Sequence, residues 1–85
     1  MVTAIVLVKA LPSEIANLGP ALAGLDGVAE VYSVAGDEDL VVILRVQDHE
    51  QVAHIVTEGI DRLAGITWTR TLIAFRAYSA NDVSF

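Results

Sequence analysis

Three consecutive acidic residues, Asp37-Glu38-Asp39, follow Gly36 and are the strongest candidates for a binding site in this sequence. Like charges in a short turn repel one another, so such a cluster usually has a solvated or a functional reason. A carboxylate beside the backbone amides of a glycine turn can hold a zwitterion, because it accepts from an ammonium group while the amides donate to a carboxyl group. The competing interpretation is that Asp and Gly are simply good turn residues.

A second group of candidates lies further along the chain, where threonine recurs at every second position. Thr67, Thr69 and Thr71 would line one face of a strand, and Trp68 would lie on the other face. Threonine is an ordinary strand former, but a threonine row beside an acidic turn would also offer short hydroxyl groups to a small polar ligand. Trp68 is either a core anchor or the wall of a pocket.

Residue types that are typical of catalytic and metal sites are sparse. The two histidines, His49 and His54, are five residues apart, which is not the four-residue spacing that stacks two ligands on one helical face. The sequence has no cysteine, no local nucleophile motif and no glycine-rich phosphate loop. We therefore predict no catalytic residue, no metal site, no cofactor and two solvated histidines.

The segments that must position these residues include four strand-like runs, at residues 2–10, 28–35, 39–46 and 66–78. The first and third are almost continuously apolar, which is typical of strands that are buried on both faces. The second and third are separated by Gly36-Asp37-Glu38, a short connection that predicts a hairpin. The acidic cluster should therefore lie at a hairpin tip.

Two other segments, 13–24 and 48–63, carry apolar residues at three- and four-residue steps, which predicts amphipathic helices. In the first, Pro20 should cause a kink or delay the regular helix to about Asn17, because proline removes one helical hydrogen bond. In the second, Asp48 with Gln51 three residues later resembles a capping box, and Gly65 should end the helix.

The predicted order of elements is β-α-β-β-α-β, which indicates an α+β ferredoxin-like sandwich. Its four-stranded antiparallel sheet would have strands one and three in the centre and both helices on one face. We predict a single domain over residues 1–85, with 79–85 as a C-terminal tail.

The composition is unusual for so short a chain. It has 85 residues and a net charge of −6, and 54% of its residues are hydrophobic, above the usual ~45–50%. Alternate positions in three of the predicted strands are apolar on both faces, so the face without helices needs a cover. A second copy of the chain, in a two-fold dimer, is the simplest cover.

The same composition excludes several other partners. The longest apolar runs are far short of the ~20 residues that a membrane-spanning helix needs, and no secretory signal is present. The acidic balance argues against direct nucleic-acid binding. The lack of cysteine fits a reducing compartment, so we expect a cytoplasmic protein.

Several motifs together resemble the effector-binding domain of Lrp/AsnC transcriptional regulators, often called the RAM domain. They are the runs 27–36, 37–42 and 45–46, then Gly65-Ile66 and 69–73, which contain G-V-x-x-V-Y-x-V-x-G-x-x-D-L and T-x-T-L-I. The likeness covers about residues 2–78 and implies the fold predicted above. The chain starts with Met1 directly before the first strand, so it resembles a stand-alone form without the DNA-binding helix-turn-helix.

The resemblance implies sheet-to-sheet dimers that assemble further, commonly into octameric rings, and a small effector, typically an amino acid, in clefts between dimers. By position, it assigns Gly36, Asp37, Glu38 and Asp39 to that cleft. It also brings in the start of strand four, with Thr67, Trp68, Thr69 and Thr71. The family often has an aromatic residue where this chain has Glu38, which leaves the identity of the effector open.

Three hypotheses about function follow. The first is a non-enzymatic amino-acid-binding oligomer that senses amino acids or modulates a full-length Lrp/AsnC regulator. The second is a small dimeric ferredoxin-like enzyme of the monooxygenase type, which would need a pocket that contains Trp68 and a histidine. The third is an ACT-like regulatory module, which would pair its sheets side by side instead of face to face.

Overall fold

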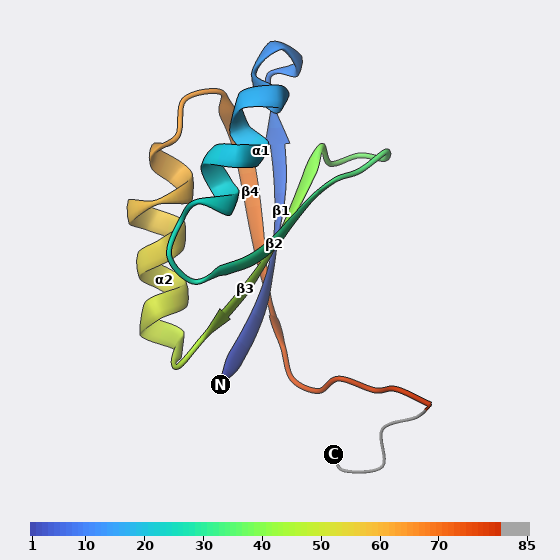
Figure 1. Cartoon of the computed structure of the whole chain (residues 1–85), viewed down its shortest axis with the longest axis vertical. Helices are drawn as coiled ribbons and strands as arrows, with labels where there is room; N and C mark the ends of the chain where they lie inside the picture. Colours follow the sequence, from blue (N-terminus) through green and yellow to red (C-terminus); the bar gives the residue numbers. More distant parts are fainter. Residues whose placement is uncertain (81–85) are drawn as a thin grey trace.

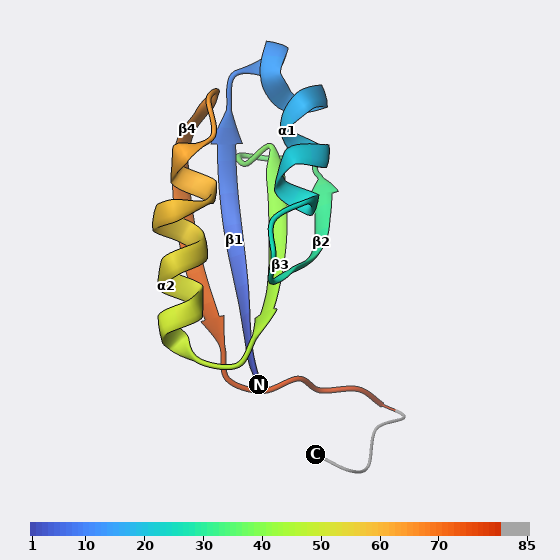
Figure 2. The same cartoon turned by 60° about the vertical axis from the view of Figure 1, so that its left-hand side comes forward.

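The computed structural model describes residues 1–80 of the chain. Four antiparallel strands form one sheet in the order β2-β3-β1-β4, and both helices cover the same face of it (Figures 1 and 2). The strands are β1 (Val2–Ala10), β2 (Val28–Ser33), β3 (Leu40–Val46) and β4 (Ile66–Ala74). The helices are α1 (Ile15–Ala23) and α2 (His49–Glu58), with the 3₁₀ turns η1 (Pro12–Glu14) and η2 (Ile60–Arg62). The predicted ferredoxin-like α+β fold, with β1 and β3 central, is confirmed.

The hydrophobic core lies between the sheet and the helices. Alternate residues of the two central strands are buried there, because successive side chains of a strand point to opposite faces. The core residues are Ala4, Val6, Val8 and Ala10 of β1, Leu40, Val42, Leu44 and Val46 of β3, Leu18 and Leu22 of α1, and Val52, Ile55 and Ile60 of the α2–η2 region.

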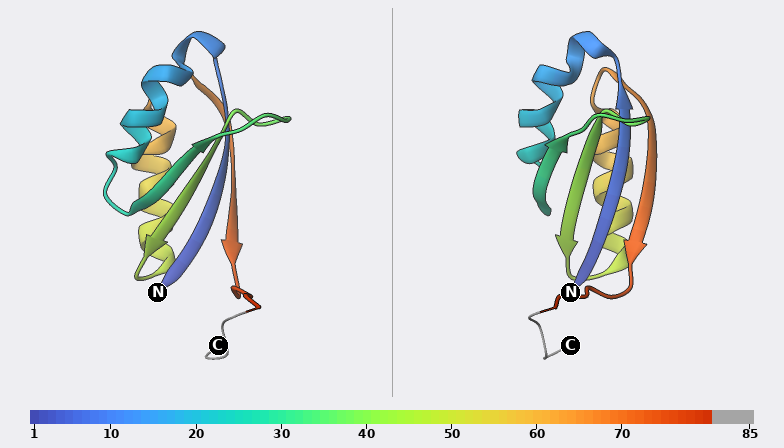
Figure 3. Two further views of the ribbon diagram at one scale, coloured as in Figure 1. Left: turned by 45° about the vertical axis from the view of Figure 1, so that its right-hand side comes forward. Right: turned by 90° about the vertical axis from the view of Figure 1, so that its right-hand side faces the viewer.

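The opposite face of the sheet carries no helix, and we refer to it as the bare face (Figure 3). The strand register places thirteen side chains on it, since directly paired residues share a face. They are Thr3, Ile5, Leu7 and Lys9 of β1, Glu30 and Tyr32 of β2, Val41, Ile43 and Arg45 of β3, and Trp68, Arg70, Leu72 and Ala74 of β4. The apolar members of the central strands are only half-buried, so the prediction that the face without helices is apolar in these strands is confirmed.

Helix α1 begins at Ile15 and continues through Pro20 to Ala23. The regular helix therefore starts two residues before the predicted position. The amide that proline lacks would have bonded to the carbonyl of Ala16, and both residues are exposed. Water can satisfy that carbonyl, so the helix tolerates the proline.

Helix α2 begins as predicted, because the Asp48 carboxylate accepts a hydrogen bond from the amide of Gln51 at 2.9 Å. Its end differs from the prediction: the α-helix stops at Glu58, and Gly59 caps it through a 3.0 Å bond to the carbonyl of Ile55. A Cβ at position 59 would lie 2.7 Å from that carbonyl oxygen, so a glycine is needed there. Gly65, with φ of 96°, instead forms the turn into β4.

Strand β4 ends at Ala74 and not at the predicted residue 78. Ala74 pairs with Thr3, and the neighbouring strand β1 begins at Val2. Residues beyond the start of β1 have no strand beside them, so β4 ends there. Residues 75–80 belong to no helix or strand and leave the sheet beyond its end (Figure 1). Of the predicted tail, residues 81–85 lie outside the described part of the chain.

No helix within the described residues has the length and apolar character that a membrane crossing requires.

Candidate functional site

The acidic cluster lies in the loop between β2 and β3, as predicted. Asp39 closes this loop: its carbonyl accepts from the amide of Val34 at 3.0 Å, and its amide donates to the carbonyl of Val8 at 2.9 Å. Its side chain also accepts a 2.9 Å hydrogen bond from the amide of Ala10. Asp39 thus fixes the loop to the end of β1, and one of its carboxylate oxygens is occupied by the protein itself.

The carboxylates of Asp37 and Glu38, unlike that of Asp39, do not bind to the backbone of the described chain. Neither Asp37 nor Glu38 makes a hydrogen bond or ion pair with another residue in the range 1–80. Asp37 is exposed and Glu38 is half-buried. Gly36 has φ of 153°, a conformation that side chains rarely adopt, and the space around its Cα is open. The loop projects away from the helices, beyond the bare face (Figure 3), so its acceptors are available to a molecule outside the subunit.

The start of β4 lies at the same end of the sheet. The Thr67 hydroxyl donates to the carbonyl of Lys9 at 3.2 Å, and the Lys9 ammonium lies 4.9 Å from the centre of the Trp68 ring, which is a cation–π distance. The end of β1 therefore has the acidic loop on one side and Thr67 with Trp68 on the other. Trp68 is 40% exposed on the bare face, so it is not a core anchor in a single subunit.

The remaining predicted threonines face the other way. Thr69 pairs with Val8 and Thr71 with Val6, both core residues, so the two threonines lie on the helix side of the sheet. The Thr69 hydroxyl is 3.2 Å from a carboxylate oxygen of Asp61 in η2. The structure thus brings Thr67 and Trp68 to the end of β1 near the loop, and places Thr69 and Thr71 behind the sheet.

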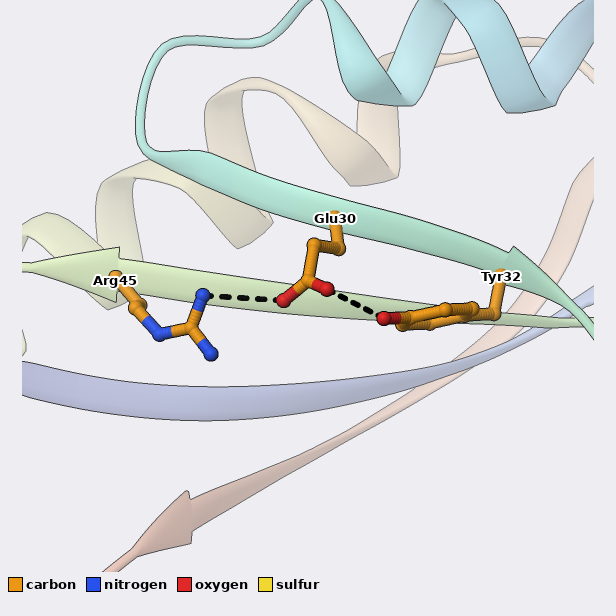
Figure 4. A network of polar contacts seen from close by, with 3 residues as sticks. All are labelled: Glu30, Tyr32 and Arg45. Carbon is orange, nitrogen blue, oxygen red and sulfur yellow. Dashed lines mark hydrogen bonds and ion pairs between the residues drawn. The ribbon is translucent and has the colours of Figure 1, made fainter.

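A polar network on the bare face was not foreseen from the sequence (Figure 4). An Arg45 guanidinium nitrogen lies 3.1 Å from one Glu30 carboxylate oxygen, and the Tyr32 hydroxyl donates to the other. The hydrogen bond from Tyr32 is the main cause that lowers the pKa of Glu30, and Arg45 adds to it. The same bond raises the pKa of Tyr32. Glu30 and Tyr32 stand two residues apart, but the register that brings Arg45 beside them is a tertiary property.

Two hollows in the described part of the chain contain no residue of the acidic cluster, although Ser33 and Leu40, which flank the loop, line one of them. One, of about 810 Å³, lies beside α2 and the turn before β2 and is lined by His54, Asp48 and Gly27 among others. Trp68 does not line it. Another, of about 420 Å³, lies between α1 and β2. Both histidines are exposed, as predicted.

The fold is a ferredoxin-like α+β sandwich with one sheet face free of helices and a projecting loop between β2 and β3. Residues 3–83 match the family model described as the Lrp/AsnC ligand binding domain, and the chain belongs to this family. The family named from the sequence motifs is therefore confirmed.

Relatives of two sizes are similar to this chain. The protein TTHA0845 from Thermus thermophilus is 48% identical, with a TM-score of 0.88 over 93% of this chain and 99% of that one. AsnC of Escherichia coli is 18% identical and shares the fold, with a TM-score of 0.86 over 96% of this chain and 56% of that one. An uncharacterised HTH-type transcriptional regulator of Pyrococcus furiosus is 35% identical over 54 residues, which are 64% of this chain and 36% of the regulator. The chain thus matches about a third of the length of its curated relatives.

Proposed function

We propose that this protein is a non-enzymatic, cytoplasmic effector-binding module that takes up a small amino acid at the loop Gly36–Asp39. Membership of a ligand-binding family supports the class of function. The observation that carries the choice of site is the state of Asp37 and Glu38, two carboxylates on a projecting loop that no other described residue engages. An ammonium group is the ligand chemistry that such acceptors favour.

The loop also offers donors. Its backbone runs through Gly36, where no side chain covers the main chain, so neighbouring amides are open to a carboxyl group. Asp39 holds the loop in place through its bonds to β1. Thr67 and Trp68 extend the same site across the end of β1. Thr69, whose hydroxyl bonds to Asp61, and Thr71 lie on the helix side of the sheet.

Self-association through the bare face is the second part of the proposal. Half-buried Ile5, Leu7, Val41 and Ile43 form its centre, and a second copy in a face-to-face dimer would bury them. Because the loop projects beyond this face, such dimers present it to a neighbour, and further assembly to an octamer would close a cleft around it. A ligand that prefers the assembled form stabilises it.

The natural target of this response is a full-length Lrp/AsnC regulator. The curated relatives are HTH-type transcriptional regulators, and a module that shares their ligand-binding fold can assemble with them through the same faces. In this role the protein reports the amino-acid level to a DNA-binding partner and makes no contact with nucleic acid or membrane itself.

Calorimetric titration of the protein with a panel of amino acids, combined with light scattering with and without each ligand, tests the proposal. We expect heat of binding for one chemical group of amino acids, accompanied by a change in oligomer mass. Asp37→Asn with Glu38→Gln should weaken binding at least tenfold, because both neutral side chains lose the charge that holds the ammonium group.

The matched control is Asp26→Asn with Glu50→Gln, which removes the same charge from exposed positions outside the loop. This control should bind like the unaltered protein. If the whole panel produces neither heat nor a change in mass, the proposed function is wrong.

A further inference from the structure

Helix α2 packs one face against the sheet and leaves its other face without a partner in the described chain. Val52 and Ile55 are buried in the core, whereas Glu50, His54 and Glu58 are exposed. These three exposed residues follow one another at four-residue steps, so they form a single stripe along the helix, which we call the α2 stripe. Figure 1 shows α2 on the side of the molecule opposite to that toward which the β2–β3 loop projects. The α2 stripe therefore stays accessible when a second copy covers the bare face.

The α2 stripe borders the larger of the two hollows, which has a volume of about 810 Å³. The turn before β2 also lines this hollow, and Asp26 of that turn adds a further carboxylate. Leu25 and Ile55 contribute apolar lining, while Gly27 and Gly59 contribute no side chain that could fill the space. The hollow thus combines carboxylates with apolar surface, which is the combination that an amphipathic cation would need.

The charge of this surface is strongly one-sided. Between residues 47 and 61 the chain contains no lysine or arginine but four acidic residues, which are Asp48, Glu50, Glu58 and Asp61. Three of the five cationic residues of the chain lie instead on the bare face. A dimer that covers its bare faces would therefore present mainly negative charge to other molecules, so charge complementarity favours a basic partner.

The carboxylates beside the hollow are available to such a partner. The side chains of Asp26 and Glu50 form no hydrogen bond or ion pair within residues 1–80. Glu58 is paired with Arg62 of the next turn at 2.6 Å, and both side chains of this pair are largely exposed. An exposed pair of this kind contributes little to stability, so Glu58 can exchange Arg62 for a cation of the partner.

The spacing of the α2 stripe indicates the shape of the partner. Its two carboxylates are eight residues apart, which is about 12 Å along a helix. A second helix that lies along α2 repeats its side chains at the same interval, so lysine or arginine residues at four-residue steps would meet both carboxylates. We infer that the α2 stripe and the hollow dock a basic amphipathic helix, with its cations on the carboxylates and its apolar residues against Leu25 and Ile55.

A DNA-binding regulator is the class of partner that supplies such a helix. A surface that binds DNA phosphates carries lysine and arginine, and a helix-turn-helix presents one helix to the major groove. The curated relatives are named HTH-type transcriptional regulators. This choice of partner rests on the proposed function, and it means that docking on α2 competes with the binding of DNA by the regulator.

Fluorescence anisotropy with a synthetic peptide tests the inference. The probe is a labelled helical peptide with lysine at every fourth position and leucine residues beside the lysines. We expect the unaltered protein to bind it, with a dissociation constant that rises with salt concentration. Asp26→Asn with Glu50→Gln should raise this constant at least threefold, because both substituted carboxylates have no partner within the subunit.

The matched control is Ser13→Lys with Asn17→Lys, which changes the net charge by the same amount at exposed positions of η1 and α1. This control should bind the peptide like the unaltered protein. A peptide of the same composition with a central proline tests the requirement for a helix, because proline breaks it, and this peptide should bind more weakly than the helical one.

Equal affinity for the helical and the proline-containing peptide would mean general attraction of cations to a chain of net charge −6, and it would overturn the inference. Equal affinity of the unaltered protein and the Asp26→Asn, Glu50→Gln variant for the helical peptide would overturn it as well. Neither result depends on the titration with amino acids. If the helical peptide binds as expected while the whole amino-acid panel gives no heat and no change in mass, the docking surface stands and the amino-acid site at the loop is wrong.

Discussion

Glu30 is the one acidic residue among the strand residues of the bare face, and its two partners explain why a charge is stable there. The carboxylate receives an ion pair from Arg45 and a hydrogen bond from Tyr32, so its charge is compensated without full exposure to water. Because the pKa of Glu30 is lowered in the fold, the ionised carboxylate stabilises the folded state at pH values above its ordinary pKa of 4.5. This stabilisation is lost as the pH falls through the lowered pKa.

Tyr32 contributes a pH dependence of stability in the opposite direction. Its raised pKa means that its contribution is present below the ordinary value of 10.0 and is lost as the pH rises through the raised pKa. The network as a whole therefore acts over the neutral range and weakens at both extremes. In a dimer it would lie at the rim of the covered face, where a paired charge is tolerated.

An ultraviolet titration of tyrosine ionisation checks this coupling. In a Tyr78→Phe background, Tyr32 is the only remaining tyrosine of the two in the sequence, and we expect it to ionise above its ordinary pKa of 10.0. Replacing Glu30 by Gln in the same background removes the negative acceptor and should bring the pKa of Tyr32 down to its ordinary value. An unchanged titration curve in the second variant would show that Glu30 does not hold the Tyr32 proton.

At the scale of the elements, the sequence pattern located every strand and helix but misjudged where some of them end. Hydrophobic periodicity is a local property, so it identified the buried strands and the apolar stripes of the helices. The end of β4 depends on where β1 begins, and the end of α2 depends on whether Gly59 or Gly65 breaks the helix. Both are set by tertiary contacts that no single segment encodes.

The candidate site also has features that the local sequence predicts and features that depend on tertiary contacts. Asp37 and Glu38 were placed correctly in the loop between β2 and β3, because turn residues between two strand-like runs are a local signal, whereas Asp39 lies at the base of that loop. That Asp39 would use its side chain on the Ala10 amide was not predictable, because the two residues are 29 positions apart in the sequence. The network around Glu30 was missed because it needs the register between β2 and β3.

Two glycines test how the elements are packed. Gly27 has φ of 97°, and a Cβ there would lie 2.5 Å from the Ile55 side chain, so Gly27→Ala meets both backbone strain and a steric clash. We expect it to lower the free energy of unfolding by about 1–3 kcal/mol. Gly19 lies inside α1, where a Cβ would meet no atom within 4 Å apart from its chain neighbours and the helix backbone. The ring of the following Pro20 disfavours a Cβ on the preceding helical residue, which offsets the usual gain from replacing a helical glycine, so Gly19→Ala should change this free energy by less than about 1 kcal/mol. Urea denaturation followed by circular dichroism measures both, and equal effects would contradict the packing described.

For the whole molecule, the distribution of apolar surface is the dominant feature. On the helix side, the residues of the two central strands are buried beneath α1 and α2, whereas the bare face leaves Trp68 and Leu72 about two-fifths exposed. Three of the five cationic residues of the chain, Lys9, Arg45 and Arg70, also lie on the bare face. The chain as a whole has a net charge of −6, so this face differs from the rest of the molecule in both charge and hydropathy.

A charge placed in the apolar part of the bare face should weaken assembly of the subunits but leave the folding of each subunit intact. Leu72→Lys adds a positive charge at an exposed position, so the subunit should keep its circular dichroism spectrum and its free energy of unfolding to within about 1 kcal/mol. The same charge would be desolvated in a dimer, so light scattering should show a shift toward monomer. Ala53→Lys, at an exposed position of α2, is the control and should assemble normally.

The position of β1 between β3 and β4 also has a consequence for the synthesis of the protein. On the ribosome β1 is made before every other strand, but its second neighbour β4 is made last of the four and ends at Ala74. One side of this central and largely apolar strand is therefore left unpaired until β4 has emerged. Pairing over such sequence distances is slow, and waiting strand edges invite aggregation. The nascent chain is thus most vulnerable in the interval before β4 becomes available.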